Sequence, residues 1–389
     1  MGKKMFYFCI GIMCFLCVSH LYAQGKIVAD SLSQTEIDKQ KEWVVKFGGF
    51  IQADYMLDVG EMESKDGFSS VSIKFPSNNK TSSYMSIRQS QLRVNIKNKK
   101  YDISGFVEID FYGNNNTTAP RLRQAYIIWK KFLVGQSWSN FSDLESSGEI
   151  FDFTGPDGLM FSRQIQVRYT TKLTPKGELS ISLENPDAPS ITFPKDSIAW
   201  QKKALLPGFT AAYRYRGSKG YLRLAGIVSP ITYEIGYRQI MKTLLGIGVN
   251  LSGAYYIKSR DSFKFQTSYG SGYSTNNISL GGMGYDATPN IYKANELRTL
   301  PMFNLTLLYE HWWAQTLSSV VYISSSEFFR ESFIPSGNLK SFRNAGANII
   351  YHPFNPFQIG FECTYGKVKE YSHMKAEAMR YQISASFKF

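Results

Sequence analysis

The stretch "AMRYQISASFKF", residues 378–389, ends the chain on a strict alternation of apolar and polar side chains. Successive side chains of an extended strand point to opposite faces. One face then carries Met379, Tyr381, Ile383, Ala385, Phe387 and Phe389, and the other carries Arg380, Gln382, Ser384, Ser386 and Lys388. The pattern predicts a strand with an apolar environment on one side and a polar one on the other.

The same period of two begins at Trp43 and predicts an all-β protein. Its candidate strands are residues 43–56, 84–97, 101–112, 121–130, 132–140, 161–173, 177–184, 205–215, 220–229, 244–257, 262–273, 301–311, 313–325, 341–352, 356–367 and 377–389. An even number of such strands, about 16, is typical of a transmembrane antiparallel β-barrel. A soluble β-sandwich shows the same alternation, so alternation alone does not separate the two.

The connections between these strands favour the barrel because short and long ones alternate. Short turns are expected at 98–100, 131, 174–177, 216–220, 259–261, 312 and 353–356. Long loops are expected at 57–83, 113–120, 141–160, 185–204, 230–243, 274–300, 326–340 and 368–376. Outer-membrane barrels have short periplasmic turns and longer extracellular loops. The last strand must then pair with the strand near Phe47, which removes the free sheet edge.

The N-terminal residues are typical of an export signal. Lys3 and Lys4 precede an apolar run that is too short to cross a bilayer, and Ala23 is a suitable cleavage position. An uncleaved anchor is the alternative, and lipoprotein processing at Cys17 is disfavoured because bulky residues precede it. We therefore expect a signal peptide over 1–23, a short periplasmic segment over 24–42 and a barrel over 43–389.

Charge and rare residues limit the possible functions. Removing Lys3 and Lys4 from the net charge of +13 leaves +11, and export argues against nucleic acid as the partner. Cys363 is alone in the exported chain, and His311, His352 and His373 lie on different strands or loops. No disulfide, metal site, cofactor or catalytic constellation is expected. We expect a protein that is not an enzyme.

Six stretches between residues 47 and 170 resemble, in order, the DcaP-like family of trimeric outer-membrane porins. They are "FGGFIQADY", "SIRQSQLRVNI", "GFVEIDFYG", "RLRQAYI", "VGQSWSNFSD" and "DFTGPDG…RQIQVRYT". The resemblance implies a sixteen-stranded barrel, a homotrimer and passage of small anionic solutes such as dicarboxylates. The segment before the barrel looks shorter and less heptad-like than the family's N-terminal coiled-coil segment.

Arginines near two carboxylates are the candidate pore-lining and solute-binding residues. They are Arg88, Arg93, Arg121, Arg123, Arg163 and Arg168, with Glu108 and Asp110. Arg93 and Arg168 alternate with apolar residues and should face the lumen, whereas Arg163 has the outward phase unless a bulge intervenes. Guanidinium groups on a pore wall attract carboxylates. They can equally form a charge ladder that stiffens the barrel, and the sequence leaves both roles open.

The loop over 139–163 is expected either to fold into the barrel, where Asp152, Asp157 and Arg163 would help to narrow it, or to lie on the surface. Passive diffusion through a porin is the leading functional hypothesis. A structural or adhesive barrel is the alternative, and an active receptor would need a plug longer than residues 24–42. The expected partners are outer-membrane lipid and the assembly machinery, which would recognise the terminal Phe389.

Overall fold

The computed structural model describes residues 42–389 except 115–116, 197–198, 237–239 and 258–259. The predicted signal peptide and all but the last residue of the predicted periplasmic segment lie outside the described residues. The first half of the barrel contains β1 (Trp43–Val59), β2 (Thr81–Ser86), β3 (Gln91–Asn98), β4 (Ile103–Asp110), β5 (Arg121–Trp129), β6 (Phe132–Trp138), β7 (Arg163–Lys172), β8 (Gly177–Glu184), β9 (Trp200–Lys203) and β10 (Gly208–Gly217).

The second half contains β11 (Gly220–Ile235), β12 (Ile240–Tyr256), β13 (Ser262–Ser271), β16 (Pro301–Ala314), β17 (Leu317–Phe328), β18 (Leu339–Phe354), β19 (Phe357–Glu370) and β20 (Lys375–Lys388). A separate hairpin is formed by β14 (Ala287–Pro289) and β15 (Leu297–Thr299). The one-turn helices that lie wholly within the described residues are η1 (Ser70–Ser72), η3 (Leu144–Ser146) and η4 (Ser274–Asn276). No helix of the described residues is long and apolar enough to cross a membrane.

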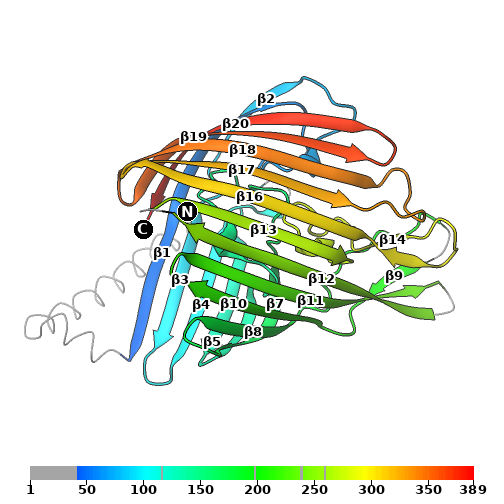
Figure 1. Ribbon diagram of the computed structural model, residues 1–389, viewed down its shortest axis with the longest axis horizontal. Helices are drawn as coiled ribbons and strands as arrows, with labels where there is room; N and C mark the ends of the chain where they lie inside the picture. The colour runs from blue at the N-terminus through cyan, green and yellow to red at the C-terminus, as the bar shows by residue number, and fades with distance from the viewer. Residues whose placement is uncertain (1–41, 115–116, 197–198, 237–239, 258–259) are drawn as a thin grey trace, which may run out of the picture.

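The described strands close into a sixteen-position antiparallel barrel (Figure 1). β2 and β3 follow each other along β1, and β9 and β10 follow each other along β11, so each pair occupies one position. The last strand pairs with the first, from Phe50 opposite Lys388 to Val59 opposite Met379. Phe389 and Gly49 also exchange backbone hydrogen bonds of 3.0 and 3.1 Å. The predicted pairing of the two chain ends is confirmed.

The two faces of the strands follow the predicted alternation. On β1, Phe47, Ile51 and Tyr55 are exposed outward, whereas Gln52 and Asp54 are buried inside. The outer surface is therefore an apolar band, as a membrane requires. The interior is largely polar, with a large apolar cluster around Phe68, Phe141, Tyr273 and Phe342 and smaller ones around Tyr233 and Tyr322.

Several predicted boundaries differ from the structure. The expected second strand is interrupted at residues 87–90, and β9 and the β14–β15 hairpin were not predicted. β11, β12, β19 and β20 run further than expected, so the long loops predicted at 230–243 and 368–376 are the short connections 236–239 and 371–374. The added end of β11 packs on other chain segments: Ile231, Tyr233 and Ile235 are buried among loop residues. The alternation continues there, but the apolar side chains have the inward phase of Arg223 and the polar Thr232 and Glu234 have the outward one.

Candidate functional site: the arginine wall and the inward loop

The predicted arginines and carboxylates on β3, β4 and β5 form one cluster, here called the arginine wall. Arg93 Nε donates to Glu108 Oε2 at 2.7 Å, and Arg123 Nε donates to Glu108 Oε1 at 2.9 Å. Arg123 Nη1 donates to Asp110 Oδ2 at 2.8 Å, and Arg121 pairs bidentately with Asp110 at 3.0 and 2.7 Å. Charge-assisted, bidentate contacts of this kind hold a guanidinium plane in place.

A register shift puts these side chains together. Glu108 faces Gln124 and Ile109 faces Leu122, so Arg123 is the extra residue of a β-bulge. A bulge adds an unpaired residue and redirects its side chain. Arg123 thereby joins Arg121 inside the barrel, where they bond the inward carboxylates of β4.

The wall is graded in exposure. The Asp110 and Glu108 side chains are 0% and 5% exposed and Arg123 is 9% exposed, whereas Arg93 and Arg121 are 40% and 36% exposed. The carboxylates and Arg123 therefore form a buried base, and Arg93 and Arg121 present charge to the lumen. Both roles considered from the sequence, ladder and solute contact, are compatible with this arrangement.

Arg88 lies apart from the wall. It is in the interruption between β2 and β3, where its guanidinium pairs with Asp66 and donates to the carbonyl oxygens of Phe111 and Gly113 at 3.2 and 3.0 Å. Its side chain is 11% exposed and lies over the Tyr112 ring. Arg88 therefore ties two loops together.

Arg163, the first residue of β7, is half-buried despite its outward phase. Its guanidinium carbon lies 5.2 Å from the centroid of the Trp138 ring, and Trp138 packs against Phe161 with the ring centroids 4.1 Å apart. The aromatic ring of its cross-strand partner thus positions this cation.

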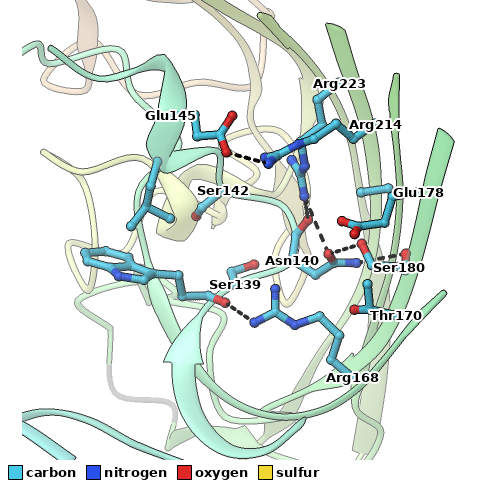
Figure 2. Close-up of a pocket in the computed structure, with 13 residues that line it drawn as sticks. Ser139, Asn140, Ser142, Glu145, Arg168, Thr170, Glu178, Ser180, Arg214 and Arg223 are labelled. Atoms are coloured by element: carbon cyan, nitrogen blue, oxygen red, sulfur yellow. Dashed lines mark hydrogen bonds and ion pairs between the residues drawn. The ribbon is translucent and has the colours of Figure 1, made fainter. Parts of the chain in front are cut away.

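Arg168 lines a cavity of about 260 Å³ between the barrel wall and the start of the loop after β6 (Figure 2). Its Nη2 donates to the Trp138 carbonyl oxygen at 3.2 Å. Two arginines not proposed from the sequence share the cavity: Arg223 donates to the Asn140 carbonyl oxygen at 2.5 Å, and Arg214 pairs with Asp143 at 2.8 Å. The alternation of Arg223 with Leu222 and Leu224, both exposed outward, is the sequence signal that indicates its inward direction.

The loop between β6 and β7, residues 139–162, crosses the inside of the barrel and is here called the inward loop. Its backbone and side chains bond inward residues of many strands. Ser252 Oγ of β12 donates to Asp143 at 2.6 Å, Lys264 Nζ of β13 donates to the Ser147 carbonyl at 2.9 Å, and Asn348 Nδ2 of β18 donates to the Glu149 carbonyl at 3.0 Å. Of the two alternatives that the sequence left open, this path is that of a loop folded into the barrel.

A buried charge network holds the far end of the inward loop. Arg380 of β20 pairs bidentately with Asp58 of β1 at 2.8 and 3.0 Å and donates to Asp152 at 3.1 Å. Glu362 of β19 accepts the backbone N–H groups of Phe151 and Asp152 at 2.9 and 3.2 Å. Every charged side chain named here is at most 5% exposed. Asp152 therefore anchors the loop and does not line an opening.

Asp157 is a second anchor of the inward loop. Its carboxylate accepts the Ser70 N–H at 3.3 Å and the Ser279 hydroxyl at 2.7 Å, so it joins three loops. Burial away from water raises the pKa of Asp157 to about 6, against the opposing effect of these hydrogen bonds. Like Asp152, it is enclosed, so its predicted part in narrowing the barrel is indirect.

The inward loop meets the arginine wall at Phe153. Its ring lies 5.8 Å from Arg121 and 5.7 Å from Arg123, measured to the guanidinium carbons, and it packs on Tyr112 with the ring centroids 4.3 Å apart. The inward loop, which Asp152 and Asp157 anchor, therefore places Phe153 against the fixed guanidinium groups of the arginine wall. Within the described residues, no group of three or more His, Cys, Asp or Glu side chains is placed to hold a metal ion.

Comparisons with known proteins agree with this geometry. The chain is similar in structure to the outer membrane channel DcaP of Acinetobacter baumannii, with a TM-score of 0.77 and 21% identity over 90% of this chain and 98% of that one. OmpT of Vibrio cholerae matches with a TM-score of 0.56 and 11% identity, covering 90% and 99%. OmpF of Salmonella typhi matches with a TM-score of 0.52 and 9% identity, covering 89% and 97%. No curated protein matches the chain.

At these identities the solved structures establish the fold alone, which is that of an outer membrane porin. The family model gives more, because it covers the whole barrel and most of the segment before it. Residues 26–389 match the model described as DcaP outer membrane protein. The chain belongs to the DcaP outer membrane protein family.

Proposed function

We propose that the protein is a passive porin that passes small, preferentially anionic hydrophilic solutes such as dicarboxylates. The observation that carries this proposal is the arginine wall facing the inward loop. Arg93, Arg121 and Arg123 stand against Glu108 and Asp110, so the wall has one net positive charge. Its two exposed members are both arginines. Rings or walls of fixed positive charge select anions in pores.

Arg168 extends the proposed path of the anion towards the short-turn side of the barrel. It lies on the inward face of β7 with Gln164 and Gln166, and its cavity also contains the guanidinium groups of Arg214 and Arg223 (Figure 2). Asp143 and Glu145 compensate Arg214. The cations of this cavity offer a second place where a carboxylate of the solute can rest.

We also propose that the porin works as a homotrimer that associates through the wall formed by β3–β8. These strands have 7 to 10 residues, whereas β11, β12 and β16–β20 have 12 to 17. A strand needs about 9 to 11 residues to cross a bilayer. The shorter wall is better suited to contact with another copy than to lipid. Another solved form of the OmpT barrel is described as a trimer.

Ion selectivity of the purified, refolded protein in a planar bilayer tests the anion proposal. With a salt gradient across the membrane, we expect a reversal potential of the sign that anion preference produces. The variant Arg93→Gln/Arg121→Gln leaves Arg123 against two carboxylates, so the wall changes to one net negative charge and the preference should be lost or reversed. The control Arg343→Gln/Lys367→Gln removes the same charge from the outer face and should keep the wild-type potential.

Cation preference of the wild-type protein would refute the anion proposal. Absence of any conductance, with the barrel folded, would instead favour the structural or adhesive alternative.

A further inference from the structure

Four basic residues gather on the outer, membrane-facing surface of the barrel near its extracellular end. Arg343 lies on β18, Lys367 and Lys369 lie on β19, and Lys375 lies on β20. Each lies on the same face of its strand as the apolar side chains that point outward. Arg343, for example, shares its face of β18 with Ile349, which is 47% exposed. These four residues are here called the basic patch.

The basic patch contains like charges in directly opposed positions. Arg343 is the cross-strand partner of Lys367, and Lys369 is the partner of Lys375. Like charges opposite each other destabilise an antiparallel pair. An anion bound between them would turn this repulsion into attraction.

Carboxylates of the same surface compensate the patch only in part. Glu327 lies 3.6 Å from Arg343 and Glu377 lies 3.3 Å from Lys367. These carboxylate side chains are 40% and 53% exposed, and exposed ion pairs contribute little. Four cations against two carboxylates leave an excess of positive charge on this surface.

An apolar groove of about 330 Å³ adjoins the patch on the same outer surface. Its floor includes Ala345, which lies between Ile323 on β17 and Tyr365 on β19 in the strand register. The groove forms because a methyl side chain separates two larger ones. Arg343 and Lys367 line its end, two residues along each strand from Ala345 and Tyr365.

We propose that the basic patch and this groove bind a phosphate-bearing lipid of the outer leaflet. The phosphate is held by Arg343, Lys367 and the neighbouring lysines, and an acyl chain lies in the groove over Ala345. Arginine binds phosphate bidentately and lysine adds a point charge, so the patch has the appropriate donors. Basic groups at a membrane interface above an apolar contact are the usual means of recognising an anionic lipid head group.

Native mass spectrometry of the full-length folded protein, titrated with bis-phosphorylated lipid A, tests this proposal. We expect the variant Arg343→Gln/Lys367→Gln to bind lipid A at least tenfold more weakly than the wild type. The control Lys97→Gln/Lys172→Gln removes two exposed lysines near the periplasmic strand ends and should bind like the wild type. Ala345→Leu fills the groove without a change of charge and should also weaken binding.

Two further measurements separate the contributions of phosphate and acyl chain. Phosphatidylcholine, which carries no net charge, should bind weakly to every variant, and higher salt should weaken lipid A binding to the wild type. Equal lipid A binding by the wild type and the Arg343→Gln/Lys367→Gln variant would overturn the proposal. So would equal binding of phosphatidylcholine and lipid A to the wild type. Neither outcome depends on solute selectivity.

Discussion

Replacing Arg380 by Gln should release the far end of the inward loop. Arg380 is 1% exposed and is the cation that pairs with Asp58 and Asp152, with Glu362 nearby on the next strand. Its removal leaves three buried carboxylates near one another without a compensating charge. Breaking a buried ion pair on one side costs about 3 to 5 kcal/mol. Asp58 and Glu362 are fixed in strands, so the loop that carries Asp152 is the part that can move away.

The lower end of this range, about 3 kcal/mol, changes an equilibrium constant by more than about a hundredfold. A loop that leaves the barrel wall even part of the time should alter single-channel conductance and increase the noise of the open-channel current. The assay is single-channel recording in a planar bilayer. Heat-modifiable migration on a gel would establish that the barrel is folded.

Arg216→Gln is the matched control for Arg380→Gln, because Arg216 pairs with Glu145 of the same inward loop. These side chains are 50% and 40% exposed, and an exposed pair contributes about 0 to 1 kcal/mol. The control should therefore conduct like the wild type. A folded Arg380→Gln variant with wild-type conductance and noise would show that the charge network does not hold the loop.

Three further changes test other parts of the structure. Asp157→Asn should reduce the pH dependence of thermal stability. In the wild type, the folded state raises the pKa of Asp157 from 3.8 to about 6. Protonation of this carboxyl therefore stabilises the folded protein below pH 4, and that stabilisation is lost as the pH rises to 6. Gly366→Val should displace the loop that contains η1, since a Cβ at Gly366 would lie 2.5 Å from the Phe68 ring and from Ser70; protease sensitivity of that loop would report it. Deleting Phe389 removes the residue that exchanges backbone bonds with Gly49, so folded, membrane-inserted protein measured by gel shift should decrease more than conductance per inserted channel.

The order and faces of most strands could be read from the sequence, because each strand separates lipid from a polar interior. That two-sided environment imposes the alternation locally, as in the outward Ile51 and inward Gln52. The same reasoning correctly placed Arg93 and Arg168 on the inner face. It missed β9 and the ends at which β11 and β12 pair beyond the predicted strands. On β11 the expected polarity of the two faces is reversed there, because Ile231, Tyr233 and Ile235 pack on loop residues.

The candidate site needed the tertiary structure. The bulge at Arg123, the position of Arg163 over Trp138 and the participation of Arg223 depend on register and on neighbouring strands, which the periodicity of one segment does not encode. The path of the inward loop depends on bonds between residues far apart in sequence, such as that of Phe151 with Glu362. The sequence by itself determined the barrel and the positive sign of its net charge. Only closure of the barrel brought Arg380, Asp58 and Glu362 together with Asp152, so that the inward loop is held opposite the arginine wall.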